Sequence, residues 1–344
     1  MSQIHTVECL RGLAALSVGY FHFTRGNEML PMPGILRESG SFGWLGVEAF
    51  FVISGFVIPL SMSVRRFDIR HDLPGFIGKR LTRLEPPYIL TVILCLILWY
   101  VSSIVPGYRG EPPSVSVKQL LLHIGYLNAF FDESWLNPVF WTLAIEFQFY
   151  FSICLIYPLV SSNKLTVGVM TITLLLLLSH TLDNSHLLLH WLGLFACGIA
   201  TWMYHAKLIN ALTLISLLAL SFTSNYFVLG LSASSVGVGT ALIIAFVTIP
   251  RHRILVFLGA ISYSFYLLHL PIGGRVINLM TRLEPSGIRD VSAVASALVI
   301  SIIAAYLMYR FVEKPSKALA AKIQYGKTLS RNEKPGEINS QTPV

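Results

Sequence analysis

The chain has 344 residues, of which 54% are hydrophobic and only 12% are charged, and its formal net charge is +8. Soluble proteins carry about 25% charged residues, so this composition excludes an ordinary soluble domain and predicts an all-α, polytopic integral membrane protein in contact with membrane lipids. The basic residues fall in short clusters between apolar runs, with no basic stripe or nucleic-acid-binding motif, so we expect no nucleic-acid partner.

Apolar runs long enough to cross a bilayer recur along the chain. A transmembrane helix needs about 20 mostly apolar residues. The runs lie at 8–25, 43–63, 84–105, 137–160, 164–181, 187–205, 207–223, 226–249, 254–279 and 290–313, which predicts about ten transmembrane helices. Between the third and fourth runs, the segment KQLLLHIGYLNAFF is too short and too polar to span, and it predicts an interfacial or re-entrant helix.

The distribution of lysine and arginine sets the expected orientation. With the N-terminus inside, the cytoplasmic loops and the C-terminal tail hold more than twice as many of these residues as the opposite face, so we expect both termini to be cytoplasmic. The N-terminus shows no cleavable signal pattern, which predicts that the first apolar run anchors the chain in the inner (cytoplasmic) membrane. We expect residues 1–318 to form one transmembrane domain and residues 319–344 a polar, disordered cytoplasmic tail.

The first run, RGLAALSVGYFH, is bracketed by Arg11 and His22. A helix rises about 1.5 Å per residue, so Arg11 is expected near the cytoplasmic end and His22 about 16 Å further out. The second run descends from outside and carries Glu48 a few residues below its outer end, which predicts that Glu48 and His22 lie at one depth and can touch. A histidine beside a carboxylate suits a general base, or a nucleophile that is transiently acylated.

The next polar pair enters the membrane with the third run. In GKRLTRLEPPYI, Arg80 and Arg83 are three residues apart and share one side of a helical turn. Guanidinium groups in such a pair suit the recognition of phosphate, and the alternative is that they are ordinary anchors at the cytoplasmic face. The layout suits a donor with a phosphorylated head inside the cell and a long, thin arm reaching outward.

Later runs bring further polar side chains to membrane depth. FWTLAIEFQFY carries Glu146 near mid-membrane, and GAISYSFYLLHLP brings His269 to the outer half with Tyr263 and Tyr266 below it. Charged residues at such depths cost about 2.5 kcal/mol or more each on insertion scales, so they face a cavity or one another and are candidates for function. The alternative for each histidine or glutamate is a structural hydrogen bond between helices.

Other features predict no further site. The four cysteines lie in apolar segments without metal-ligand spacing, so we expect them to be buried hydrophobic residues. His180, His186 and His190 straddle a short outer loop, and we expect them to be solvated histidines at its edge and not a metal site. Gly237 and Gly239 lie inside an apolar run without a strand-turn-helix context, which favours helix packing over nucleotide binding.

Six segments in this order resemble the membrane acyltransferase 3 family over nearly the whole chain. RGLAALSVGYFH is similar to the family's signature of a basic residue, ten residues and a histidine, GVEAFFVISGFVI to its second-helix motif, and KRLTRLEPPY to its Arg-x-x-Arg segment before a proline. WTLAIEFQFY, ISYSFYLLHLP and RFVEKP are similar to its later landmarks. The order of the segments is more specific than any one of them.

The resemblance implies transfer of an acyl group, most often acetyl, from coenzyme A to a hydroxyl of a cell-surface carbohydrate or glycolipid. His22 would be the catalytic histidine, Arg11 its motif partner, and Arg80 and Arg83 the contacts to coenzyme A. We therefore expect His22, Glu48 and Glu146 to be catalytic and Arg11, Arg80, Arg83, Tyr263 and His269 to bind substrate. Acetyl-CoA is expected as a donor substrate, with no tightly bound cofactor.

Two departures from the family pattern bear on this expectation. Glu85 adds an acidic residue to the Arg-x-x-Arg segment, which weakens the case for a phosphate site there. We also see no C-terminal extracytoplasmic hydrolase-like extension, so an extracytoplasmic partner protein is a candidate for completing the transfer.

Two alternatives of other classes remain open from the sequence. One is a proton-coupled transporter or flippase of an envelope precursor, with the intramembrane histidines and glutamates as a proton relay; against it, we find no internal repeat and no paired broken helices. The other is a non-catalytic scaffold of a polysaccharide assembly complex. Turnover of an acyl donor would separate the enzyme from both.

Overall fold

The structure is a computed structural model that describes residues 2–28, 34–106 and 113–326. Over these residues the chain is helical and contains no strand, as expected for an all-α protein. Six stretches of the described chain are long and apolar enough to cross a membrane: Ile35–Val64, Ile69–Ser103, Phe140–Val160, Ala211–Leu229, Arg253–Met280 and Gly287–Lys322. The protein is therefore an all-α membrane protein.

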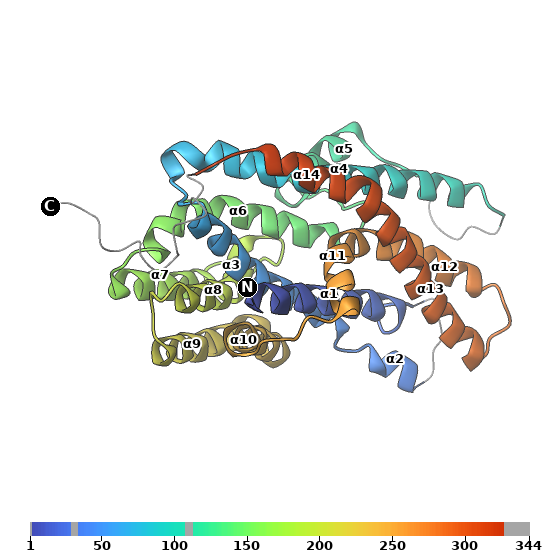
Figure 1. Cartoon of the computed structure of the whole chain (residues 1–344). Coiled ribbons are helices and arrows are strands. Elements are labelled where there is room, and N and C mark those ends of the chain that lie inside the picture. Colours follow the sequence, from blue (N-terminus) through green and yellow to red (C-terminus); the bar gives the residue numbers. More distant parts are fainter. Residues whose placement is uncertain (1, 29–33, 107–112, 327–344) are drawn as a thin grey trace.

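The described residues form the following helices, labelled as in Figure 1. They are α1 Ser2–Phe23, α2 Ile35–Ser39, α3 Gly46–Val64, α4 Ile69–Ser103, α5 Val117–His123, α6 Phe140–Val160, α7 Leu165–Leu178, α8 Leu188–His205, α9 Ala211–Leu229, α10 Leu231–Phe246, α11 Arg253–Leu268, α12 Gly274–Met280, α13 Gly287–Met308 and α14 Lys314–Lys322. Short 3₁₀ turns precede α3 and α6, at Gly43–Leu45 and Asn128–Phe130. Two π-helical turns, His269–Gly273 and Tyr309–Glu313, follow α11 and α13.

Every apolar run overlaps helical residues, although run 226–249 covers the end of α9 as well as α10 and run 254–279 covers both α11 and α12. The expected count of about ten spans is not confirmed. Beyond the six long stretches, α7 and α10 are apolar but shorter than 18 residues. The third run was expected to begin at residue 84, whereas α4 begins at Ile69 and is 35 residues long. It begins there because the Asp68 carboxylate accepts a hydrogen bond from the backbone N–H of Arg70 and caps the helix.

Glycines set how closely the central helices approach, and they fix their relative levels. Gly12 of α1 lies against Gly259 of α11, where a Cβ atom on Gly12 would be 2.8 Å from the Gly259 nitrogen. Gly19, further along α1, faces the ring of Phe265, so α1 and α11 run in the same direction. On α3, Gly55 faces the Phe195 carbonyl of α8. Small residues of this kind allow close helix packing in membranes.

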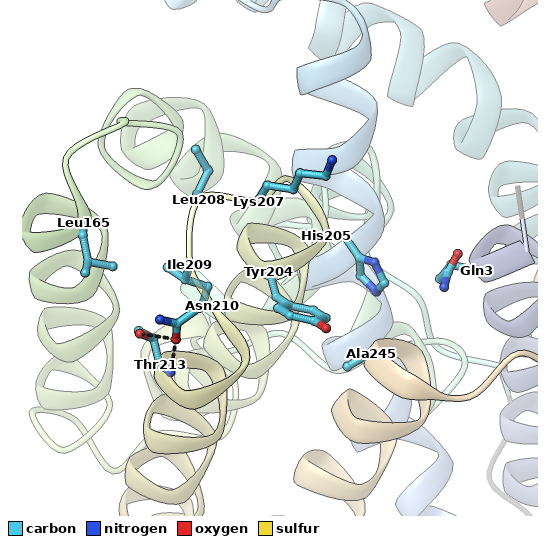
Figure 2. Close-up of a pocket in the computed structure, with 10 residues that line it drawn as sticks. All are labelled: Gln3, Leu165, Tyr204, His205, Lys207, Leu208, Ile209, Asn210, Thr213 and Ala245. Carbon is cyan, nitrogen blue, oxygen red and sulfur yellow. Dashed lines mark hydrogen bonds between the residues drawn. The ribbon is translucent and has the colours of Figure 1, made fainter. Parts of the chain in front are cut away.

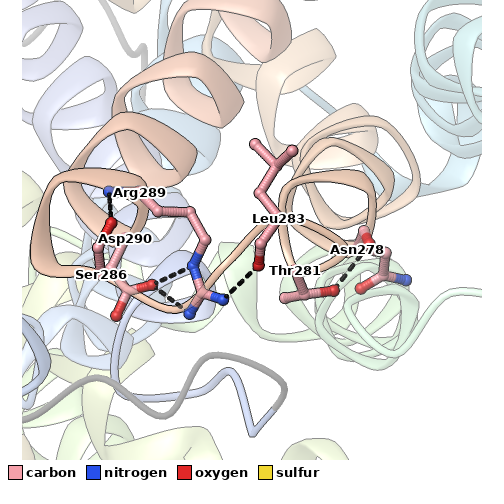
Figure 3. A network of polar contacts seen from close by, with 6 residues as sticks. All are labelled: Asn278, Thr281, Leu283, Ser286, Arg289 and Asp290. Atoms are coloured by element: carbon pink, nitrogen blue, oxygen red, sulfur yellow. Dashed lines mark hydrogen bonds and ion pairs between the residues drawn. The ribbon is translucent and has the colours of Figure 1, made fainter.

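The bundle places α1 at its centre, packed against α3 on one side and α11 on the other (Figure 1). Helices α4 and α14 lie side by side along one flank, and α9 and α10 pack together along the opposite flank. The loop between α12 and α13 is fixed by Arg289, whose guanidinium donates to Asp290 Oδ1 from two nitrogens and to the Leu283 carbonyl (Figure 3). This ion pair is almost fully buried.

The ordered chain continues past the last apolar run. The boundary expected at residue 318 falls inside α14, and Tyr325 is only 6% exposed. Residues 319–322 thus continue α14, which packs against α4, and Tyr325 is buried beyond it, while the division of the chain into a domain and a tail stays a prediction. The remainder of the expected tail, residues 327–344, lies outside the described residues.

Helix α5 docks onto α4 through a buried histidine. The Nδ1–H group of His123 donates to the hydroxyl of Tyr88 at 2.9 Å, and its Nε2 accepts from the backbone N–H of Leu136 at 3.4 Å. Both bonds require the neutral imidazole, because a protonated ring has no acceptor. The side chain is 2% exposed, and its burial lowers the pKa of His123 to about 4.

We expect the docking of residues 117–137 to weaken as the pH falls from about 6.5 toward 4. A released His123 gains a proton near its ordinary pKa of 6.5, while the docked one resists protonation down to about 4, so the docking is progressively destabilised as the pH falls through this window. Amide hydrogen exchange of residues 117–137, normalised to intrinsic rates, should show lower protection at pH 5 than at pH 7. A His123→Gln variant should lose this pH dependence, and equal protection at both pH values in the wild type would refute it.

Candidate functional site

A small cavity lies among α1, α3, α6 and α11, in the interior of the bundle. Its volume is about 50 Å³, enough for a few water molecules. Apolar side chains of α3 and α6 form part of its wall. The polar residues that line it are Arg11, Ser54, Thr142, Glu146, Ser262, Tyr263 and Tyr266. Three of the residues expected from the sequence, Arg11, Glu146 and Tyr263, thus meet at one cavity.

Glu146 is held in the cavity by two hydroxyl groups on one of its carboxylate oxygens. Ser54 of α3 donates to Oε1 at 3.0 Å, and Tyr150, one turn later on α6, donates to the same atom at 2.8 Å. No salt bridge joins Glu146 to a described cation, although Arg11 lines the same cavity. The carboxylate is thus fixed in place and keeps hydrogen-bonding capacity for a ligand.

Three arginines gather beside this cavity. Arg83 of α4 interacts electrostatically with Arg11 of α1 and with Arg80, one turn earlier on α4. Arg80 donates to Ser61 Oγ at 3.1 Å, and its guanidinium carbon lies 5.3 Å from the ring centre of Phe76 and 5.4 Å from that of Tyr150. Arg11 and Arg83 form no hydrogen bond or ion pair with a described residue. Like charges inside a membrane protein repel unless an anion compensates them, so this cluster favours an anionic ligand.

Glu313 provides part of the compensation and was not singled out from the sequence. It is 1% exposed and lies in the second π-helical turn, where its carboxylate accepts hydrogen bonds from Ser264 of α11 and from Lys317 of α14. It also interacts electrostatically with Arg83. The segment RFVEKP was the signal that could have identified it, because it places an acidic residue at the end of an apolar run. Glu313 thus ties the last long helix to α11 beside the arginines.

Two histidines form the other end of the site. The rings of His22 and His269 lie 5.3 Å apart between centres. His269 is fully buried, and its Nδ1–H donates to the carbonyls of Tyr266 at 2.8 Å and Phe265 at 3.3 Å. This assigns the proton to Nδ1 and leaves the Nε2 lone pair, which has no partner among the described residues. A buried acceptor without a partner is rare in a folded protein and points to a ligand.

Tyr266 connects the cavity to the histidine pair. Its side chain lines the cavity, its hydroxyl lies 2.8 Å from Thr142 Oγ1, and its ring centre is 5.8 Å from that of His269. His269 also begins the first π-helical turn, a feature that is frequent at functional sites. Tyr263, one turn before Tyr266, donates to the Leu84 carbonyl and joins α11 to α4.

The expected contact between His22 and Glu48 is not formed. No hydrogen bond or ion pair joins them among the described residues, and the nearest ring partner of His22 on another helix is His269. The reason is the level of α3. Its first residue, Gly46, faces Ala14 and Val18 of α1, so Glu48 lies further toward the N-terminal end of α1 than His22 does. Glu48 is 1% exposed, and its Oε2 has no partner among the described residues.

A larger cavity of about 600 Å³ opens at the surface around the turn between α8 and α9 (Figure 2). None of the eight residues expected from the sequence lines it. Its lining residues include the cation Lys207 but no carboxylate, and the His205 ring hydrogen-bonds the Ile244 carbonyl. Asn210 caps α9 by accepting hydrogen bonds from Thr213 (Figure 2). The smaller cavity is therefore the better candidate for the functional site, because it brings together an arginine, a glutamate and several hydroxyl groups.

Comparison with known proteins decides the class. A family model described as an acyltransferase domain, acyltransferase 3, matches residues 4–310. The chain belongs to this family. The match contains all eight expected site residues and the first π-helical turn, and it ends two residues into the second, at Arg310. The protein is thus a membrane acyltransferase.

Relatives in several organisms are similar to this chain. It is 29% identical over 287 residues to "Putative acetyltransferase ORF330" of Acidianus two-tailed virus, covering 76% of this chain and 81% of the relative. It is 28% identical to "Putative peptidoglycan O-acetyltransferase YrhL" of Bacillus subtilis and 25% identical to "Putative O-acetyltransferase SACOL0978" of Staphylococcus aureus. These matches cover 89% and 92% of this chain but only 54% and 57% of the relatives, so the chain spans about half the length of the two bacterial proteins. No solved structure matches this chain.

Proposed function

We propose that this membrane acyltransferase moves an acetyl group from acetyl-CoA in the cytoplasm to a hydroxyl of a cell-surface carbohydrate or glycolipid, in the inner (cytoplasmic) membrane. The observation that carries the proposal is the continuity of the site: an arginine cluster, a polar cavity and a histidine pair follow one another through the bundle. The names of three relatives, which all describe acetyltransferases, support acetyl as the acyl group. The words "peptidoglycan O-acetyltransferase" in one of them support a carbohydrate hydroxyl as the acceptor.

The donor end of the proposal uses the arginines. Arg80 and Arg83 bind phosphates of coenzyme A through paired guanidinium hydrogen bonds, and Arg11 adds positive charge where the arm of the donor enters the cavity. The thioester then passes Glu146, Tyr263 and Tyr266 toward the histidine pair. Glu85, whose carboxylate is buried and interacts with the side chain of Tyr126, is carried by the same helix. In this proposal Glu85 lies beside the path of the acyl donor and does not contact its phosphates.

The transfer step uses His22 as the base. His22 removes the proton of the acceptor hydroxyl while its oxygen attacks the thioester carbonyl. The carbon–sulfur bond breaks, coenzyme A leaves as the thiolate, and the proton on His22 returns to it as the thiol, so that an acetyl ester and free coenzyme A result. His269 Nε2 accepts a hydrogen bond from the acceptor or from His22 and keeps the reacting groups in register.

The enzyme assay tests the proposal as a whole. Purified protein in lipid nanodiscs should release coenzyme A from acetyl-CoA faster when cell-envelope glycan is added, and mass spectrometry of the glycan should show added acetyl groups. Release that does not depend on any acceptor, or no release at all, would overturn it.

The donor contacts predict a specific binding defect. Replacing Arg80 and Arg83 together with glutamine should weaken acetyl-CoA binding at least about tenfold, because hydrogen bonds to charged groups contribute about 1.5–3 kcal/mol each. Equilibrium binding of radiolabelled acetyl-CoA measures the effect. Arg70→Gln serves as the matched control, because Arg70 is an exposed arginine at the start of the same helix. Equal affinity in the double variant and the control would return Arg80 and Arg83 to the role of membrane anchors.

The proposed orientation predicts where reporters are active. A reporter that works only outside the cytoplasm should be silent when fused after Val344 and active when inserted within residues 26–41. Each fusion is paired with a cytoplasm-specific reporter, whose activities should be the opposite. The inverse pattern would place the arginine cluster outside the cell, where coenzyme A is absent, and would refute the cytoplasmic donor.

A further inference from the structure

Beyond α14 the chain turns back onto the beginning of α4. We call residues 323–326 the strap. The backbone N–H of Gly326 donates to Asp72 Oδ1 at 2.7 Å, and Lys79 Nζ donates to the Ile323 carbonyl at 3.4 Å. Gly326 has a φ of 68°, and a Cβ atom there would collide with the Arg65 carbonyl, so glycine is required at this close approach. The strap lies outside residues 4–310, the part that matches the acyltransferase family.

Tyr325 is the side chain that the strap inserts. It is 6% exposed, and its ring centre lies 5.6 Å from that of Phe76 and 6.3 Å from that of Phe67. Two cations face the same ring: the guanidinium carbon of Arg65 is 4.9 Å from its centre and Lys79 Nζ is 5.7 Å away. The hydroxyl makes no hydrogen bond to a described residue. The contacts of Tyr325 are therefore made by its ring.

These contacts lead to Arg80 through one intervening ring. Phe76 is fully buried, touches Tyr325 on one side, and lies 5.3 Å from the guanidinium carbon of Arg80. Tyr150, which also hydrogen-bonds Glu146, provides a second ring for Arg80. If Tyr325 were absent, Phe76 would lose a neighbour and could move toward the vacated space, because a buried ring next to a void relaxes into it. Arg80 would then lose one of the two rings that hold its guanidinium.

The strap also faces a group of positive charges on α4 and the residues before it. Arg65, Lys79 and Arg80 lie close enough that like-charge repulsion between them is felt at Lys79. The electron-rich faces of Tyr325 and Phe76 attract such cations. The strap thus keeps Arg65 and Lys79 on the Tyr325 ring and leaves Arg80 with Phe76 and Tyr150.

We propose that Tyr325 is a positioning residue that, acting through Phe76, holds Arg80 in the geometry that binds the phosphates of the acyl donor. This rests on the proposed function, in which Arg80 binds the donor. The strap, which lies outside the family match, would then contribute to the donor site. It would affect the affinity for the donor and not the chemical step.

The experiment measures binding of coenzyme A to the purified full-length protein in nanodiscs by titration calorimetry, and steady-state turnover of acetyl-CoA. Tyr325→Ala should raise the dissociation constant and the KM for the donor by about tenfold while kcat stays near that of the wild type. Tyr325→Phe should behave like the wild type, because the hydroxyl has no partner. Chains that stop after Lys322 should resemble Tyr325→Ala, and chains that stop after Gly326 should resemble the wild type.

A double-mutant cycle separates positioning from general stability. In the Arg80→Gln background, Tyr325→Ala should change the donor affinity no further, because the residue through which it acts is already gone. Equal and additive losses in both backgrounds would overturn the proposal, and so would an unchanged KM in Tyr325→Ala. If Tyr325→Ala fails to fold, Tyr325→Leu and the two truncated chains give the same comparison. A wild-type protein that binds no coenzyme A would instead overturn the proposed function on which this inference rests.

Discussion

Replacing His22 with alanine is expected to abolish acetyl transfer while leaving the protein folded. His22 is half-buried and has no hydrogen bond to a described residue, so alanine removes the base without orphaning a partner. Nor does alanine add a polar group to the membrane interior. A positioned general base contributes about 10²–10⁴-fold to a rate. We therefore expect the rate of acetyl transfer to fall by about this factor or more when no other base replaces His22.

The measurement is acceptor-dependent release of coenzyme A by wild type and variant, with an unfolding scan to show that both are folded. His205→Ala is the matched control, because His205 is also a histidine at a helix end but hydrogen-bonds the Ile244 carbonyl and lies at the other cavity. We expect His205→Ala to keep most of the activity. Full activity in His22→Ala would eliminate His22 as the base and with it the proposed transfer step.

The helices and their polar side chains could be predicted from sequence because each depends on local pattern. Every apolar run overlaps helical residues, and the spacing of Arg80 and Arg83 is enough to place them on one side of α4. Arg11, Glu146 and Tyr263 could be proposed as site residues because charge and hydroxyl groups inside apolar runs are costly unless they are used. The structure brings these three residues to one cavity.

The positions of the helices relative to one another along the bundle axis could not be predicted from sequence. For this reason the predicted contact between His22 and Glu48 was wrong. The expectation assumed that α3 begins at the same outer level as α1 ends. The chain instead forms α2 and a 3₁₀ turn before α3, and Gly46 starts the helix beside Ala14. Such an offset depends on packing between glycines and the backbone of a neighbouring helix, which hydrophobic pattern does not encode.

The strap was missed for a related reason. It lies in a polar C-terminal stretch, and polar composition near a terminus predicts a solvated tail. Burial of Tyr325 depends on partners that are distant in sequence, since Gly326 bonds to Asp72 across 254 positions. The pairing of a ring with two cations and two other rings becomes visible only when α4 and α14 lie side by side.

For His269 the sequence leaves open whether it binds substrate or makes a structural hydrogen bond, and the hydrogen bonds of its ring favour substrate binding. A structural histidine in a membrane uses both ring nitrogens, because an unpaired polar atom there costs free energy. His269 uses only Nδ1, and its Nε2 is buried without a partner among the described residues, close to His22. We therefore expect Nε2 to accept a hydrogen bond during the reaction.

His269→Ala should lower kcat by about 10²–10³-fold, and His269→Gln should retain part of the lost activity, because its side-chain oxygen can accept a hydrogen bond where Nε2 does. Steady-state turnover of acetyl-CoA gives kcat and KM for each variant, and the KM for the donor should change little because the arginines are intact. Tyr266→Phe is the control: it removes the hydroxyl that meets Thr142 but keeps the backbone carbonyl that binds His269 Nδ1, so its kcat should fall much less. If His269→Ala loses thermal stability and keeps its kcat, the histidine is a structural link between helices, and the proton moves through His22 alone.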